Sequence, residues 1–113
     1  GTGHASIDDT VLRDRHLLAQ NGVLICVTHV DSKGRLNRAP EIVHHGMSND
    51  ISRNFIENCQ QRVIDALEDI RPHRPSQPTQ EDEIRQALRR LARRTIKKNP
   101  LVVPIVIQED PPQ

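Results

Sequence analysis

The chain has 113 residues, 35% of them hydrophobic, and a net charge of +1. This length allows one domain, and the composition excludes an intrinsically disordered chain. Phe55 is the only aromatic residue, so the core must be aliphatic and single-stranded nucleic acid finds almost no aromatic side chain on which to stack. The longest apolar runs are far too short to span a bilayer, and we expect no signal peptide, which predicts a cytoplasmic protein with no membrane contact.

The first predicted element is a short helix. Residues 1–8 are interpreted as a tag or a disordered lead, and Asp8 or Asp9 is expected to cap a helix that ends before Asn21-Gly22. Apolar and charged residues of this helix are expected to lie on opposite sides.

Two strands are predicted next. Val23–Val30 is a run of β-branched and apolar residues, which is typical of a central strand covered on at least one face. A turn at residues 31–34 leads into a weaker strand over residues 35–45, which Pro40 interrupts. Because so short a connection permits only antiparallel pairing, the two strands are expected to form a hairpin.

Two longer helices follow the hairpin. A stripe of apolar residues at helical spacing predicts a helix over residues 53–71, capped by Asp50 or Ser52. Three prolines in residues 72–78 predict a stiff, extended connector. After it, Thr79 is expected to cap the last helix, which has acidic residues in its first turn.

The final strand is predicted over residues 101–107, with Pro104 at a sheet edge or a bulge, and residues 109–113 are interpreted as a polar tail. The domain is therefore expected to occupy residues 9–108. These elements predict an α+β fold, namely a two-layer sandwich in which two long helices cover one face of a three-stranded sheet, with the short N-terminal helix in addition.

The uncovered face of this sheet is the first candidate functional surface. Two of the predicted strands are apolar at successive positions, so they present aliphatic side chains to both faces, whereas the helices cover only one. This pattern predicts a homodimer that uses the sheet. The candidate interface residues are Val23, Ile25, Val27, Val102, Val103, Ile105, Val106 and Ile107.

The basic side of the last helix is the second candidate surface. Seven cations occur there in a stretch with no acidic residue, namely Arg85, Arg89, Arg90, Arg93, Arg94, Lys97 and Lys98. One interpretation is a surface that binds RNA phosphates without sequence choice. The other is the solvated side of an amphipathic helix, because acids in the first turn and bases in the last turn are what the helix dipole favours.

Residues for catalysis or metal binding are not found in any recognised arrangement. The six histidines show no metal-ligand spacing, and adjacent His44 and His45 would point to opposite faces of a strand. Cys26 and Cys59 are interpreted as two buried thiols of a cytosolic protein. The residues themselves therefore predict no catalytic site, no metal site and no cofactor in this chain.

Three segments nevertheless resemble one family, in order along the chain. Residues 9–22 are similar to the pattern V-L-R-D-R-x-x-L-A-x-D-G of the C-terminal domain of bacterial ribonuclease J. Residues 39–46 are similar to its segment G-P-E/D-I-I-S-R-G, and residues 94–107 to its segment R-T-x-R-R-P-M-I-L-P-V-I-M. The chain departs from the family after Gly46, where an aromatic F-V-Y segment is replaced by Met47-Ser48-Asn49.

This resemblance implies a non-catalytic domain of an RNA-processing enzyme. In that family, a metallo-β-lactamase domain with an inserted β-CASP domain cuts RNA with two zinc ions, as an endonuclease and as a 5′-to-3′ exonuclease. The C-terminal domain implied for this chain is a three-stranded sheet with two helices that joins subunits and supports the active enzyme in RNA degradation and maturation. Expected partners are a second copy and the lactamase and β-CASP domains, with accessory RNA binding through residues 84–98 as the alternative role.

Overall fold

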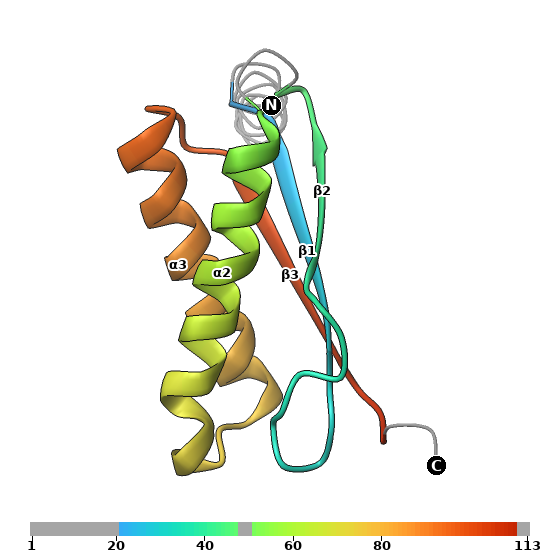
Figure 1. Cartoon of the computed structure of the whole chain (residues 1–113). Coiled ribbons are helices and arrows are strands. Elements are labelled where there is room, and N and C mark those ends of the chain that lie inside the picture. The colour runs from blue at the N-terminus through green and yellow to red at the C-terminus, as the bar shows by residue number, and fades with distance from the viewer. Residues whose placement is uncertain (1–20, 48–50, 111–113) are drawn as a thin grey trace, which may run out of the picture.

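The computed structural model describes residues 21–47 and 51–110. Three strands form one mixed sheet in the order β2-β1-β3: β1 is Val23–Val30, β2 is Glu41–His45 and β3 is Leu101–Gln108. Two long helices, α2 (Arg53–Ile70) and α3 (Gln77–Thr95), are joined by a short 3₁₀ helix, η1 (Arg71–His73). Both helices lie on the same side of the sheet and run in opposite directions (Figure 1). The predicted α+β class, the three-stranded sheet and the two long helices are confirmed, whereas the predicted N-terminal helix lies outside the described residues.

The hairpin formed by β1 and β2 is antiparallel, as predicted. Its turn is held by Asp31, whose Oδ1 accepts backbone hydrogen bonds from Lys33 (2.8 Å) and Arg35 (3.0 Å), and these bonds lower the pKa of the Asp31 carboxyl. Gly34 has the positive φ of 80° that this turn requires. The turn therefore sets the Val30–Leu36 bridge next to it, whereas the ladder of Glu41–His45 pairs with β1 in a register shifted by two residues.

β2 is shorter than the predicted strand over residues 35–45. Only Glu41–His45 pairs continuously with β1, and the earlier residues contribute one isolated bridge between Leu36 and Val30. Pro40 lies between the two and has no N–H to offer a ladder. The side chain of Asn37 donates instead to the carbonyl of Glu109 (2.8 Å), which ties this part of the chain to the end of β3.

β3 pairs with β1 in parallel, along all eight residues of each strand. The Leu101 N–H donates to the Gly22 carbonyl (3.0 Å) and the Glu109 N–H to the Val30 carbonyl (2.8 Å). In a parallel ladder every second residue of a strand donates its N–H to the neighbouring strand, and in β3 these are the odd-numbered residues. Pro104 is even-numbered, so its nitrogen points away from β1. Because β3 is an edge strand, Pro104 interrupts no ladder bond, and the predicted edge position is confirmed.

α2 and α3 each begin at a serine cap. Ser52 Oγ accepts from the Phe55 N–H (3.0 Å) and Ser76 Oγ accepts from the Thr79 N–H (3.3 Å). The prediction that Thr79 caps the last helix is therefore wrong by one turn. Pro78 lies in the first turn of α3, where its missing N–H costs nothing, and Pro72 lies in η1, so two of the three prolines belong to helices rather than to an extended connector.

The core fills the space between the helices and one face of the sheet. On β1 the exposure alternates strictly, and its even-numbered residues are buried. The fully buried side chains include Leu24, Met47, Val63, Ile84 and Leu88. This core is almost wholly aliphatic, as the composition predicts.

The start of β1 depends on a glycine. Gly22 has φ of 79°, and a Cβ at this position would lie 2.6 Å from the His45 carbonyl oxygen and against Met47 Cγ. We therefore expect Gly22→Ala to lower the free energy of unfolding by more than about 2 kcal/mol, because a left-handed backbone and a backbone clash add together. Urea denaturation measures this loss.

Gly34→Ala is the matched control for this substitution. Its φ of 80° is nearly the same, but an added Cβ meets nothing closer than 3.6 Å. We expect a loss of about 1 kcal/mol, which is the conformational penalty alone. Equal losses for the two variants would show that the close contact at Gly22 carries no cost.

Candidate interaction surfaces

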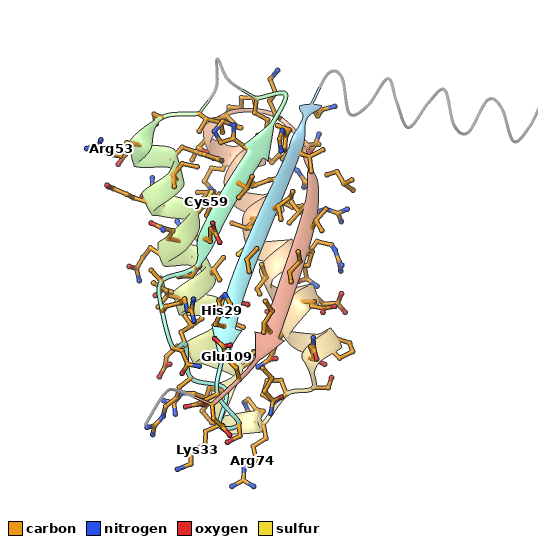
Figure 2. The ribbon with its side chains drawn as sticks, turned by 90° about the vertical axis from the view of Figure 1, so that its right-hand side faces the viewer. His29, Lys33, Arg53, Cys59, Arg74 and Glu109 are labelled. Carbon is orange, nitrogen blue, oxygen red and sulfur yellow. The ribbon has the colours of Figure 1, made fainter. Side chains whose placement is uncertain are left out.

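The face of the sheet that the helices leave uncovered carries the large hydrophobic residues that are exposed in the described part of the chain. We call it the outer sheet face, and Figure 2 presents it to the viewer. It carries the odd-numbered residues of β1 and β3 and, through the antiparallel register, those of β2. Its aliphatic members are Val23, Ile25, Val27, Val43, Leu101, Val103, Ile105 and Ile107.

These side chains form continuous rows across the three strands. Val43, Ile25 and Val103 make one row, and Val27 continues the next row to Ile105. Val43 is 36% exposed, Leu101 45%, and Ile105 and Ile107 are each 39% exposed. A contiguous aliphatic patch with this exposure is typical of a surface that another chain covers.

Six of the eight predicted interface residues lie on the outer sheet face. The other two, Val102 and Val106, are each 3% exposed and belong to the core. Their assignment to the interface is therefore wrong. Leu101 and Val43 lie on the face but were not predicted. Alternation along β3 could have identified Leu101, whereas Val43 required the register of the hairpin.

Polar groups border the outer sheet face at the end of β1. His29 Nδ1 lies 2.9 Å from Glu109 Oε1, although its N–H is not aligned for a hydrogen bond. Arg38 donates to the same carboxylate oxygen (2.9 Å). Glu109, which the sequence assigned to a polar tail, is thus held by two neighbouring segments, and Figure 2 shows it beside His29.

The cations predicted for RNA binding lie on α3 and just beyond its end. Arg89, Arg90, Arg93, Arg94 and Lys97 are exposed, whereas Arg85 and Lys98 are half-buried. Arg85 and Arg93 are among those that have local partners.

One of these partners, the carboxylate of Asp82, reduces the charge that is available to a ligand. Arg85 forms an ion pair with Asp82, and Arg93 Nε donates to Asn99 Oδ1 (3.3 Å). Lys97 follows the end of α3 with φ of 58°, which is a left-handed conformation. The exposed cations therefore concentrate near the C-terminal end of α3, where the helix dipole also favours them.

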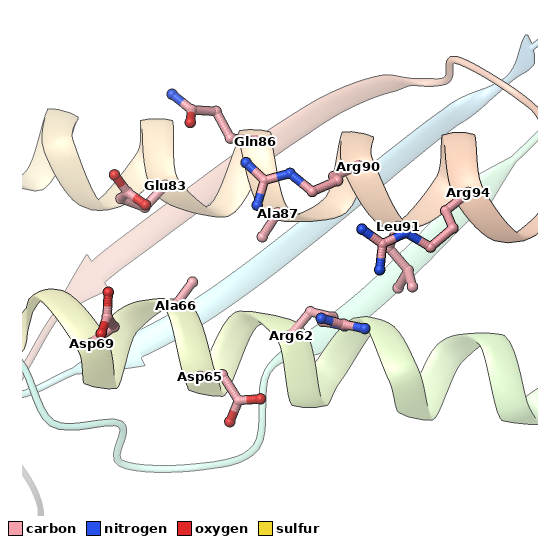
Figure 3. Close-up of a pocket in the computed structure, with 10 residues that line it drawn as sticks. All are labelled: Arg62, Asp65, Ala66, Asp69, Glu83, Gln86, Ala87, Arg90, Leu91 and Arg94. Carbon is pink, nitrogen blue, oxygen red and sulfur yellow. The ribbon is translucent and has the colours of Figure 1, made fainter.

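A groove of about 340 Å³ runs between α2 and α3 on the side away from the sheet. Figure 3 shows the guanidinium groups of Arg62, Arg90 and Arg94 toward one end and the carboxylates of Asp69 and Glu83 at the other, with the carboxylate of Asp65 between them. Arg62 comes from α2, so the sequence pattern of α3 alone could not identify it. Because Arg62, Arg90 and Arg94 line the same groove, Arg62 lies next to the predicted basic surface of α3.

The two cysteines are unpaired and fully buried in the core. Burial raises the pKa of the Cys26 thiol to about 12, with a smaller contribution from Cys59, and burial raises the pKa of Cys59 to about 12. Among residues 21–47 and 51–110, no group of three or more His, Cys, Asp or Glu residues could hold a metal ion. No helix in this part of the chain is long and apolar enough to cross a membrane.

The described residues form a small α+β domain with an exposed aliphatic sheet face and a charged groove between its two helices. The model of the ribonuclease J C-terminal domain matches residues 10–109. The chain belongs to this family, and the resemblance of the three segments is confirmed.

Two curated relatives illustrate the similarity. The chain is 31% identical over 116 residues to Ribonuclease J 2 of Staphylococcus aureus (strain NCTC 8325). It is 29% identical over 116 residues to Ribonuclease J 2 of Staphylococcus epidermidis (strain RP62A). Each alignment covers 94% of this chain and 20% of the relative, so the chain spans about a fifth of the length of the curated relatives it matches.

The buried thiols lead to a prediction about their reactivity. With a pKa of about 12, only about one thiol in ten thousand is ionised at pH 8, and the thiolate is the reactive form. We expect no labelling of Cys26 or Cys59 by iodoacetamide in the folded chain, and labelling of both in the urea concentrations that unfold it. Mass spectrometry after timed quenching measures this, and fast labelling of the folded chain would contradict the burial of the two thiols.

Proposed function

We propose that this domain joins two copies of a ribonuclease J-like protein through the outer sheet face. The observation that carries the proposal is the row pattern of exposed aliphatic side chains on a sheet whose other face is covered by α2 and α3. A two-fold contact between identical faces hides this surface on both copies and leaves none to grow further. The family match supports a role within a ribonuclease J-like protein.

Packing of the faces fits this sheet better than addition of a strand. At the open edge of β3, Pro104 has no N–H with which a further strand could pair. At the opposite edge, β2 offers only five residues. The aliphatic face is therefore the larger and better suited of the available contacts.

The size of the face limits the strength of the contact. Three strands of eight residues or fewer cover about 26 Å by about 14 Å, which is about 360 Å². A standard stable interface buries about 800 Å² on each partner. We therefore expect a dimer of the isolated chain in the micromolar range, and a tighter one where further parts of a longer protein add to the interface.

Substitution of two exposed residues tests the association. We expect the wild-type chain to form dimers at about 10–100 μM, and Leu101→Lys combined with Ile105→Lys to remain a folded monomer, because two charges on each face repel across the interface. Light scattering over a concentration series measures the mass, and circular dichroism checks the fold.

Val102→Lys combined with Val106→Lys is the matched control on the same strand. These side chains face the helices, so burying two charges should unfold the chain rather than separate two folded copies. A wild type that is monomeric throughout the concentration series would overturn the proposal for this domain, as would unchanged dimers of the Leu101→Lys, Ile105→Lys chain.

The chemistry of the whole protein forms part of the same proposal. We infer that the longer protein cleaves RNA as a zinc-dependent endonuclease and 5′-to-3′ exonuclease in the cytoplasm, and that its lactamase and β-CASP domains carry the zinc ligands and contact this domain. The family match and the printed name of the relatives support a ribonuclease. In this division of labour the present domain contributes assembly and no catalytic group.

A second candidate function is accessory RNA binding at the helices. The observation that favours it is the convergence of Arg62, Arg90 and Arg94 at one end of the groove between α2 and α3. Phosphates would be bound there without sequence choice, because no aromatic side chain is available to stack on bases. The acidic end of the groove would confine the contact to its basic half.

The salt dependence of RNA binding tests this role. We expect the logarithm of the binding constant for a single-stranded oligonucleotide to fall linearly with the logarithm of salt concentration. Arg90→Gln combined with Arg94→Gln should reduce that slope by about 1.4, since each lost phosphate contact contributes about 0.7. Arg38→Gln combined with Arg53→Gln, which removes equal charge outside the groove, should leave the slope unchanged. Equal effects of the two double variants would show that RNA is attracted by the overall charge and not by the groove, and would overturn this second role.

A further inference from the structure

The outer sheet face carries a carboxylate and an imidazole among its aliphatic side chains, and both belong to β2. Glu41 pairs with Val27 of β1 and His45 pairs with Val23, so the two side chains lie on the same face as Val43, which is midway between them. All three residues of β2 are exposed. In a contact between two copies of this face, these two groups decide which arrangements bury a polar side chain against an aliphatic one.

The residues of the outer sheet face form rows across the strands. The first three rows each take one residue from β2, one from β1 and one from β3: His45 with Val23 and Leu101, Val43 with Ile25 and Val103, and Glu41 with Val27 and Ile105. A fourth row has only His29 and Ile107, because β2 does not extend to it. The first and third rows thus have one polar end each, and these ends are about 13 Å apart along the strand.

A two-fold axis between the two faces can run along the strands or across them. An axis along the strands places β2 of one copy over β3 of the other. His45 would then lie against Leu101 of the second copy, and Glu41 against Ile105 of the second copy. Burying a carboxylate against an aliphatic side chain without a hydrogen-bond partner is costly, so this arrangement is disfavoured.

An axis across the strands places β2 over β2 and reverses the direction of the strands. If the axis follows the second row, the first row of each copy lies over the third row of the other. His45 then faces Glu41 of the second copy on both sides of the axis, and every other position in the three rows pairs two aliphatic side chains. Packed sheets are about 10 Å apart, a distance that an imidazole and a carboxylate side chain span together.

Other positions of the same axis match the polar groups less well. A shift by half a row sets Val43 over Glu41 or over His45 of the second copy. A shift by a full row sets the two copies of Glu41, or the two copies of His45, against each other. Like charges that face each other oppose association, so the axis along the second row is the arrangement that satisfies both groups of both copies.

We propose that two copies of the outer sheet face pack about a two-fold axis along the row of Val43, Ile25 and Val103, and that His45 of each copy binds Glu41 of the other. This arrangement rests on the proposed dimer and specifies how its two faces meet. An imidazole N–H can donate to a carboxylate whether or not the ring is charged. Because β2 is an edge strand, the two pairs lie at the margin of the contact, where charged groups set the register more than the affinity.

Charge reversal on β2 tests the pairing. We expect His45→Glu to raise the Kd of the dimer by about 10-fold, because two carboxylates then face each other on both sides of the axis. The double variant Glu41→Lys, His45→Glu should return Kd to within about threefold of the wild type. Within one chain the two positions are about 13 Å apart, so this rescue acts between copies. Sedimentation equilibrium measures Kd, and circular dichroism checks the fold.

His73→Glu is the matched control for the change of charge. It makes the same substitution at an exposed residue of η1, outside the outer sheet face, and should change Kd by less than about twofold.

A mixture of two single variants gives a second measurement of the same pairing. Dimers of Glu41→Lys alone set two cationic side chains together, and dimers of His45→Glu alone set two carboxylates together. A mixed dimer of the two variants restores an oppositely charged pair on one side of the axis and the natural pair on the other. We expect native mass spectrometry to show the mixed dimer in excess over the statistical proportion.

Two isoleucines of β3 test where the axis lies. Ile105 and Ile107 are on the same face of the same strand and are each 39% exposed. The proposed axis places Ile105 over Leu101 of the second copy, whereas the row of Ile107 meets no row of the second copy. We expect Ile105→Lys to raise Kd by about 10-fold or more, and Ile107→Lys by less than about threefold.

These measurements separate the geometry from the dimer itself. A wild type that is monomeric at every concentration overturns the dimer and this geometry with it. A wild-type dimer whose Kd is unchanged by His45→Glu, or is not restored in the double variant, overturns the geometry alone. Equal weakening by Ile105→Lys and Ile107→Lys, or a statistical mixture of the two single variants, also overturns the geometry and leaves the dimer standing.

Discussion

β1 is hydrogen bonded along both of its edges, and this one constraint determines where the other elements lie. The antiparallel edge needs only the short turn at Asp31, whereas the parallel edge requires a long connection. α2 and α3 provide that connection, and they bring their apolar sides over the sheet on the way. The layer of helices is therefore as much the path back to β1 as it is a cover for the core.

The same arrangement leaves the sheet half covered. β1 and β3 are aliphatic at nearly every position, as strands buried on both faces are, yet the described helices lie on one side only. Half of the aliphatic side chains thus stabilise the domain, and the other half remain on the outer sheet face. A substitution at an even-numbered residue of β3, such as Val102, alters the core, whereas a substitution at an odd-numbered residue alters the outer sheet face.

The sequence predicts the elements of this fold well where periodicity is strong. The stripe through α2, the run through β1 and the edge position of Pro104 all follow from spacing and from the backbone of proline. The register between strands is not encoded locally, so Val43 could not be assigned to the outer face. For the same reason, the sequence did not show that Val102 and Val106 face the helices rather than the outer side of the sheet. Arg62 was missed for a related reason, because it meets the arginines of α3 only after the chain has folded.

Because β1 and β3 are parallel neighbours, the described chain enters the sheet at one end and leaves it at the other. Residue 22 is hydrogen bonded to the first residue of β3, and Glu109 to the last residue of β1. A force that pulls these two points apart would act along the strands, so it would load all the hydrogen bonds between β1 and β3 together in shear. This geometry resists stretching far better than one in which bonds open singly, so the domain resists unfolding when it is pulled between Gly22 and Glu109.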